Sequence, residues 1–302
     1  IMTKLSLARE KLIEMYISAL NENEIPWEQQ WHNGINKNGI TNREYNGINQ
    51  LILSFTSYFE KYTDSRWLTY LQIKNNGYKL ADGKGKGVPV EFWSVYDKKN
   101  KKNISYEDYE DIIKLCPDLK ENFVIYNKTV NVFNGDLIVG LPKETLNNKK
   151  IEPSHYISNL IKKMDVKYSE KGNKALYRPR TDEIVLPPSH LFFDKYSYYA
   201  TQLHELCHAT GNKKRLNRDF SNDEENYARE ELVAEISSSF LMPKINIDVK
   251  AVHYDNHKRY IQYWIKILKE QPAELFKAIN EAKKVCDYID NITKSKTKKY
   301  ER

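Results

Sequence analysis

The chain has 302 residues, enough for one large domain or two ordinary ones. Hydrophobic residues make up 40% of it, and 48 Lys and Arg against 41 Asp and Glu give a net charge of +7. This composition is that of a globular protein and excludes an acidic mimic of DNA, and no run approaches the ~18 apolar residues of a membrane span.

The N-terminal half begins with a predicted amphipathic helix over residues 3–24, which mixes charged and apolar side chains. Because no secretory h-region is present and the three cysteines are far apart, we expect a reducing, cytoplasmic location without disulfides. Thr69, with Gln72 three residues later, predicts a capping box at the start of a short helix. Residues 88–93 read as a strand, and 123–133 as another strand or as a hairpin turning at Asn127-Lys128.

Charge is distributed unevenly along this half. Residues 37–102 hold 12 Lys and Arg against 6 Asp and Glu, whereas residues 107–121 are acidic. A glycine–lysine loop at 79–87 lacks the spacing of a nucleotide P-loop, and a lysine cluster at 98–102 is typical of a hairpin tip or an insertion. The basic stretch is a possible phosphate-binding surface, although a solvated lysine-rich face is the commoner explanation.

The best linker candidate, 141–153, contains Pro142, Pro153 and a polar run. After it we predict a helix over 154–164, two short strands over 177–187 and helices over 199–211 and 230–243. Two closing helices are predicted over 256–270 and 273–290.

The helix over 199–211 contains His204, Glu205 and His208 in the H-E-x-x-H pattern of zinc peptidases. Four residues separate the histidines, so both imidazoles project from one side of the helix and can reach one zinc ion. Glu205 is placed to act as general base toward water. Between Thr201 and Thr210 no other charged residue occurs, as a buried metal site requires.

A third ligand is expected on the next helix. Glu231 and Glu235 lie four residues apart on one face of it, where two carboxylates repel each other unless a cation or an imidazole N–H absorbs the charge. Glu231 as metal ligand, with Glu235 accepting the N–H of a ligating histidine, resolves this conflict. Glu230 in place of Glu231, or a solvated acidic patch, are the alternatives.

The sequence gives little support for a second metal site or for nucleophilic catalysis. His253 and His257 form a second histidine pair, but no acidic helix remains to complete a site, and we interpret it as an exposed turn. No G-x-S-x-G motif is present, and Cys207 lies between the proposed ligands, where we expect it to be buried and inert.

Aromatic residues alternate with basic ones in the N-terminal half, as in proteins that stack unpaired bases beside a basic groove. Most of these aromatic residues must nevertheless fill a core. They are Trp27, Trp31, Tyr45, Trp67, Tyr70, Tyr78, Trp93 and Tyr96.

The order of motifs resembles that of plasmid antirestriction proteins of the ArdC type. In the N-terminal half the resemblance rests on PWEQQW at 26–31, REYNGINQLIL at 43–53, RWLTYLQIKNNGYK at 66–79 and the glycine–lysine loop. In the second half it rests on 199–211, Arg215-Leu216-Asn217-Arg218, EELVAE at 230–235 and the closing helix. Peptidases of the ImmA/IrrE type share H-E-x-x-H and a later E-x-x-A helix ending in Leu-Met-Pro, which favours Glu231 as ligand.

The resemblance implies an α+β protein of two domains. A mixed α/β domain over 1–142 would bind single-stranded DNA, and a mainly helical, zincin-like metallopeptidase domain with a small sheet would occupy 151–302. The residues expected at the DNA are Arg43, Tyr45, Asn49, Arg66, Trp67, Lys79, Lys84 and Lys86.

The function implied is protection of mobile-element DNA from host restriction, with one zinc ion, or manganese or another divalent ion, in a hydrolase that acts on an unknown protein or peptide. Two alternatives stay open. One is a non-catalytic DNA-binding protein with a structural zinc site, and the other is a cytosolic zinc peptidase acting on a regulator protein. No membrane partner is expected.

Overall fold

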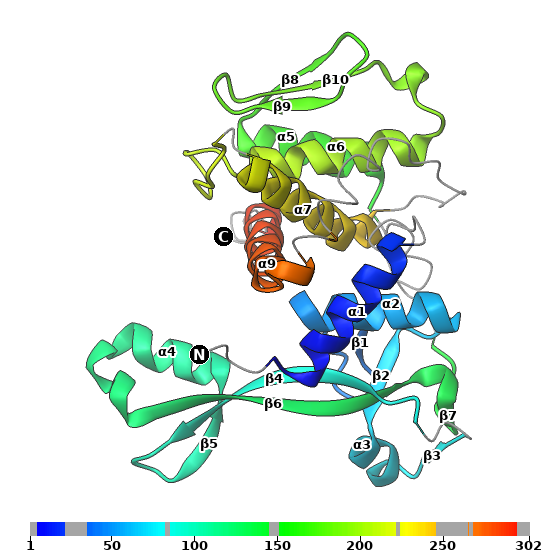
Figure 1. Cartoon of the computed structure of the whole chain (residues 1–302), viewed down its shortest axis with the longest axis vertical. Coiled ribbons are helices and arrows are strands. Elements are labelled where there is room, and N and C mark those ends of the chain that lie inside the picture. Colours follow the sequence, from blue (N-terminus) through cyan, green and yellow to red (C-terminus); the bar gives the residue numbers. More distant parts are fainter. Residues whose placement is uncertain are drawn as a thin grey trace, which may run out of the picture. The chain divides into compact units, whose positions relative to one another are not determined.

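A computed structural model describes residues 5–21, 35–81, 85–144, 151–221, 224–245, 265 and 268–294. Contacts between residues divide the chain into two compact units (Figure 1). The first comprises 1–12 and 36–142, and the second comprises 13–35 and 143–302. The α+β class with two units agrees with the sequence-based prediction.

The first unit is built on a five-stranded sheet in the order β1-β2-β6-β4-β5. Its strands are β1 (Lys37–Asn38), β2 (Arg66–Thr69), β4 (Val88–Asp97), β5 (Lys102–Ser105) and β6 (Phe123–Asn134). All neighbours are antiparallel except β1 and β2. A separate pair is formed by β3 (Lys79–Leu80) and β7 (Ile138–Val139).

The course of strand β6 rules out one of the two predictions for residues 123–133. A hairpin turning at Asn127-Lys128 is not formed, because β6 runs without a break and pairs with β4 over ten consecutive residues. The continuous ladder satisfies the backbone of both residues and overrides the local turn signal. The lysine cluster at 98–102 does form the hairpin turn between β4 and β5, as predicted.

The helices of the first unit are α2 (Gly47–Glu60), α3 (Tyr70–Asn75), α4 (Tyr106–Leu115) and the short helices η1 (Pro117–Asn122) and η2 (Gly135–Leu137), and α1 (Leu7–Asn21) begins in this unit. In Figure 1, α4 lies near β5 and α3 near β3, at opposite ends of the β4–β6 ribbon. The acidic stretch of 107–121 thus forms α4 and η1.

Apolar residues of α2 and of the β2 end of the sheet form the core of this unit. Leu51, Ile52, Phe55 and Trp67 are all at most 1% exposed. The indole N–H of Trp67 donates to Asn36 Oδ1 at 2.7 Å, so the buried ring has its polar atom satisfied.

Thr69 begins α3 with the predicted capping box. Its hydroxyl accepts from the backbone N–H of Gln72 at 3.2 Å, and Gln72 Oε1 accepts from the Thr69 N–H at 2.9 Å. Thr69→Ala is expected to destabilise this unit by about 1 kcal/mol, measured by urea denaturation. Thr69→Ser keeps the oxygen acceptor and should retain most of the stability, whereas an equal loss in both variants would contradict a capping role.

The second unit places a small sheet over helices. Its strands β8 (Lys167–Glu170), β10 (Glu183–Leu186) and β9 (Leu176–Arg178) pair in that order, β10 parallel to β8 and antiparallel to β9. The main helices are α5 (Pro153–Met164), α6 (Lys195–Ala209), α7 (Glu224–Leu241) and α9 (Ala273–Lys294), with short turns η3 (Ser189–Leu191) and η4 (Met242–Lys244). Figure 1 shows α5 and α6 between the sheet and the α7–α9 pair.

Each predicted helix from 154 to 243 and the two strands around 177–187 are confirmed, as is the helix at 273–290. The histidine pair at 253 and 257 and most of the predicted helix 256–270 lie outside the described residues. No helix in the described part of the chain has the length and apolar character that crossing a bilayer requires.

Candidate metal centre

His204 and His208 lie one turn apart on α6, with their Nε2 atoms 3.0 Å from each other. Asp194 caps this helix by accepting from the Ser197 N–H at 2.7 Å. Leu203 and Leu206 anchor the helix in the core, with at most 1% of their surface exposed. The two imidazoles are thereby held at one point of the buried side of α6.

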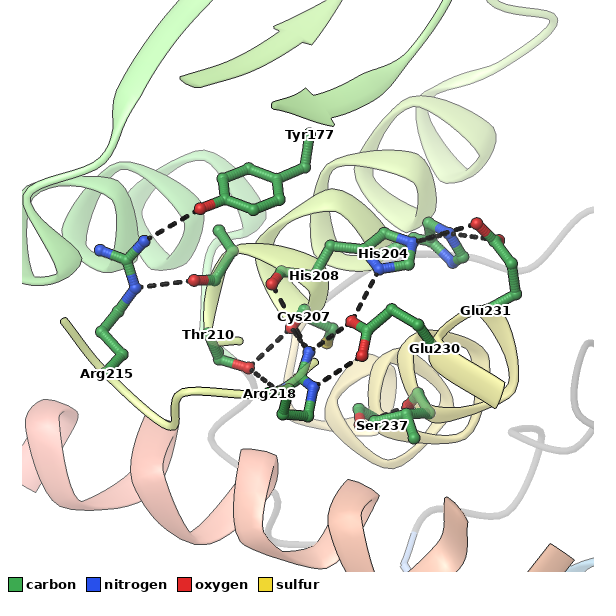
Figure 2. A network of polar contacts seen from close by, with 12 residues as sticks. Tyr177, His204, Cys207, His208, Thr210, Arg215, Arg218, Glu230, Glu231 and Ser237 are labelled. Carbon is green, nitrogen blue, oxygen red and sulfur yellow. Dashed lines mark hydrogen bonds and ion pairs between the residues drawn. The ribbon is translucent and has the colours of Figure 1, made fainter. Parts of the chain in front are cut away.

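Glu231 approaches the same point from α7 (Figure 2). Its Oε2 is 3.5 Å from His204 Nε2, and its Oε1 is 3.6 Å from His208 Nε2. One donor atom from each of the three residues lies within 4.8 Å of the others. The structure thus brings together the three residues that the sequence predicts as metal ligands.

The outer nitrogen of each imidazole also meets a carboxylate. His204 Nδ1 is 3.4 Å from Glu235 Oε1, and His208 Nδ1 is 3.0 Å from Glu230 Oε1. A carboxylate that accepts from Nδ1–H leaves the lone pair of Nε2 directed into the site. Glu235 lies beside His204 Nδ1, as predicted, but its Oε1 does not form a hydrogen bond with that nitrogen. The contact of Glu230 with His208 was missed.

Arg218 holds Glu230 in place. Its Nε donates to Glu230 Oε2 at 2.8 Å and its Nη2 to Glu230 Oε1 at 2.6 Å (Figure 2). The same guanidinium donates to Thr210 Oγ1 at 2.7 Å and to the Cys207 carbonyl at 2.8 Å. Arg218 belongs to the Arg215–Arg218 motif in the sequence. Its partner Glu230 lies twelve residues later, beyond a loop, and no local sequence pattern predicts their contact.

Glu205 is 6% exposed, and its Oε2 has no hydrogen-bond partner among the described residues. Burial raises the pKa of Glu205 above its ordinary value, opposed in part by the nearby histidines and by the backbone N–H of Tyr177 on β9. A carboxylate with a raised pKa is a stronger base, which suits it to accept a proton near neutral pH. Cys207, between the two histidines, is fully buried, and burial raises the pKa of its thiol, as expected of an inert cysteine.

Charge in the site favours a bound cation. Burial opposes protonation of His204, but the carboxylates of Glu235 and Glu231 outweigh it and raise the pKa of His204 to about 10. Burial likewise opposes ionisation of Glu231, but His208 and His204 lower the pKa of Glu231 to about 2. The pocket therefore stabilises positive charge at its centre.

The donor set fits a divalent metal ion. Two imidazole nitrogens and one carboxylate are a known set for such ions in hydrolases. The carboxylates of Glu205, Glu230, Glu231 and Glu235 face only one guanidinium in the contacts described above, so an added dication would offset most of the excess negative charge. A water molecule bound beside such an ion would also donate a hydrogen bond to Glu205 Oε2, which has no other partner among the described residues.

Four of the residues expected at DNA are buried or hydrogen-bonded within the fold. Trp67 is fully buried, so its ring offers no stacking surface, and Tyr45 is 8% exposed. Arg66 is 9% exposed and binds Asp64 and the Pro142 carbonyl. Asn49 makes two hydrogen bonds, at 2.7 and 2.8 Å, with the backbone of Glu91 on β4.

Three of the other residues expected at DNA are accessible to solvent. Arg43, Lys79 and Lys86 are exposed, and Lys86 pairs with Glu60 at 2.8 Å. Lys84 lies outside the described residues. Burial of the aromatic members Tyr45 and Trp67 follows from packing that the sequence motif does not report, and DNA contact by the exposed residues stays a prediction.

Comparisons with known proteins cover both units. Residues 7–133 match the family model of the N-terminal domain of anti-restriction factor ArdC, and residues 155–281 match that of a zincin-like metallopeptidase. The chain is 34% identical over 294 residues to a DNA primase TraC of Escherichia coli, aligning with 93% of this chain and 20% of that protein. A second TraC primase of Escherichia coli is 32% identical, and the chain spans about a fifth to a quarter of the length of these curated relatives.

Two crystal structures of the antirestriction protein ArdC from plasmid R388 have the same fold. The metal-free form superposes with a TM-score of 0.71 at 26% identity, covering 95% of this chain and 98% of the other. The Mn(II)-bound form gives 0.72 at 26% identity, covering 96% and 99%. With an ArdC N-terminal domain, a zincin-like metallopeptidase domain and the ArdC fold over nearly its whole length, the chain belongs to the ArdC-type family of antirestriction proteins.

Proposed function

We propose that the protein binds single-stranded DNA through its first unit, carries a metallopeptidase centre in its second, and protects mobile-element DNA from restriction. The observation that carries the enzymatic part is the meeting of His204, His208 and Glu231 around the buried base Glu205. Membership of the ArdC-type family and the net charge of +7 support the DNA-binding part.

A divalent ion held by His204, His208 and Glu231 would supply a Lewis acid for a peptide carbonyl and acidify water beside it. Zinc is the ion we propose, since two imidazoles and one glutamate form a catalytic zinc set with an open position. The Mn(II)-bound relative makes manganese the alternative, and metal analysis of the purified protein decides between them.

The residues of the chain itself have distinct tasks in this proposal. Glu205 takes the proton of the attacking water and passes it to the leaving amine. Glu235 and Glu230 keep His204 and His208 oriented, and the substrate is a protein or peptide. A purely structural metal site is disfavoured, because such a site has four protein ligands and no need of a buried base.

Glu205→Gln tests the enzymatic part. The substitution removes the base but keeps the size of the side chain, so metal content should be unchanged while hydrolysis of a casein or a peptide library falls about 100-fold or more. Glu225→Gln, an exposed change on α7, serves as control. Full hydrolysis by Glu205→Gln would contradict the role of the base, and no hydrolysis by the unmodified protein would favour a non-catalytic metal site.

The antirestriction part is tested by transferring unmodified plasmid DNA into a restricting host with and without the protein. We expect protection to raise the number of transformants. Comparing Glu205→Gln in the same assay shows whether protection needs hydrolysis.

A further inference from the structure

The ribbon of β4 and β6 has two faces, because successive side chains of a strand point to opposite sides. The ladder pairs Phe92 with Lys128, Ser94 with Tyr126, and Tyr96 with Val124, so these six side chains share one face. We call it the aromatic face. Trp93, Val95 and Asp97 and their partners on β6 occupy the opposite face.

The aromatic face is open to solvent among the described residues. Phe92 is 40% exposed, Tyr96 37% and Val124 43%. Tyr126 is half-buried, and its hydroxyl donates to Asn103 on β5 at 3.2 Å, which holds the ring in place. Large apolar side chains grouped in this way on a surface mark a binding site more often than isolated ones do.

The opposite face is covered near the β4–β5 hairpin. Tyr109 of α4 packs edge-on against Phe123 with ring centroids 5.4 Å apart, and Val95 is fully buried. Figure 1 shows α4 beside this end of the ribbon. The acidic helix α4 thus packs on the covered face and leaves the aromatic face uncovered by it.

Exposed charge on the ribbon is positive. The lysines that are exposed on β4, β5, β6 and the hairpin turn are Lys98, Lys99, Lys101, Lys102 and Lys128. Both acidic residues of β4 are buried, Glu91 against Arg9 at 2.9 Å and Asp97 against the backbone of Lys99 at 2.9 Å. Lys102 pairs with Asp97 and so belongs to the opposite face, and Lys98 donates to the Glu121 carbonyl at 2.8 Å. The positive charge on the aromatic face itself comes from Lys128, with Lys99 and Lys101 in the hairpin turn beyond Tyr96. An anionic ligand fits this surface, whereas a second copy would bring its own lysine against Lys128.

We propose that the aromatic face is the place where single-stranded DNA binds, with Phe92, Tyr126 and Tyr96 stacking on successive unpaired bases. Aromatic side chains on an uncovered sheet face stack bases in this way, beside cations that bind phosphates. The three rings follow at two-residue steps, about 7 Å apart along the ribbon. Lys128 is the cross-strand neighbour of Phe92 on the same face, and the hairpin lysines follow Tyr96 along the chain. The inference rests on the proposed single-strand binding and gives it a location.

The test uses the full-length protein and a fluorescein-labelled oligothymidylate of about 20 nucleotides in an anisotropy titration. Phe92→Ala and Tyr96→Ala should each weaken binding about 5- to 150-fold. Tyr96→Leu keeps an apolar side chain without a ring and should lose a similar factor. Lys128→Gln should weaken binding and lower the slope of log K against log salt by about 1.

Trp93→Ala is the matched control, since Trp93 is 50% exposed on the same strand but faces the other way. We expect its affinity to stay within about twofold of the unmodified protein. An equal loss in Trp93→Ala, or full binding by the Phe92 and Tyr96 variants with unchanged thermal melts, overturns the assignment while leaving single-strand binding intact. Absence of binding by the unmodified protein overturns the proposed DNA function itself. Self-association that these variants abolish, in place of DNA binding, would make the face a dimer interface and also overturn the inference.

Discussion

Replacing Arg218 with Met is expected to destabilise the metal-free protein by about 3–5 kcal/mol and to weaken metal binding about 10- to 100-fold. The side chains of Arg218 and Glu230 are only 6% and 9% exposed and share two hydrogen bonds. Without the guanidinium, Glu230 is left as a buried charge next to His208 Nδ1 alone. The hydrogen bonds to Thr210 and to the Cys207 carbonyl are lost as well.

Chemical denaturation with and without metal, and competition with a chelator, measure the two effects separately. Arg229→Met is the matched control, because Arg229 on α7 also binds a glutamate, Glu274 at 2.8 Å, but is 33% exposed. Glu274 is buried but keeps Lys277 at 2.6 Å as a partner, so the loss of Arg229 should cost at most about 1 kcal/mol and leave metal affinity unchanged.

The double variant Arg218→Met with Glu230→Gln separates two effects of the single change, the unpaired charge of Glu230 and the lost orientation of His208. Both buried charges are then gone, so much of the lost stability should return. The glutamine carbonyl still accepts from His208 Nδ1, and metal affinity should recover in part. If the single Arg218 variant bound metal as tightly as the unmodified protein, the proposed support of His208 would be wrong.

Arg215→Met is expected to cost a similar 3–5 kcal/mol of stability in the second unit. Arg215, with 4% of its side chain exposed, donates to the carbonyls of Ala209 at 2.7 Å and Met164 at 2.9 Å and pairs with the buried Asp182. It thereby ties the end of α6 to α5 and to the turn between β9 and β10. Lys214→Met is the control, because Lys214 reaches Asp182 only at 3.5 Å and is 63% exposed.

The Arg215 effect should depend on pH. Burial opposes ionisation of Asp182, but the hydrogen bond from Arg215 outweighs it, and the pKa of Asp182 is lowered below its ordinary value. A lowered pKa means that the pair stabilises the fold fully above the pKa of the unfolded chain, about 3.9. The contribution is lost as pH falls below that value through the folded pKa. Denaturation from pH 7 downward should show the stability gap between the two proteins narrowing only in this acid range, and a constant gap would contradict the pairing.

Within a helix, sequence spacing alone selected most of the residues of the candidate metal centre. The four-residue separations of His204 and His208 and of Glu231 and Glu235 fix which side chains share a face. The structure places His204, His208 and Glu231 around one point, with Glu235 at the outer nitrogen of His204. The sequence suggested Glu230 only as an alternative metal ligand to Glu231 and gave no role to Arg218, because the contact between them depends on the path of the loop between α6 and α7. No periodicity describes that path.

In the first unit, the sequence indicated which aromatic residues are available for binding DNA but not which of them are buried in the core. Trp67 and Trp93 lie on strands of one sheet, yet the first is fully buried under Tyr62 and Asn36 and the second is half exposed. An isolated strand of four residues does not say which of its faces a helix covers. The turn signal at Asn127-Lys128 was overridden for a related reason, since ten pairings with β4 outweigh one dipeptide.

The metal centre also has a consequence for the order in which the second unit folds. Every side chain that meets at its centre or supports the two histidines comes from residues 204–235, so its contacts are short in sequence and carry a small cost of loop closure. The helix α9, which packs against α7, is synthesised only later, from residue 273 onward. A metal ion can therefore meet a complete set of donors on the nascent chain before the helix that buries the far side of α7 has been made.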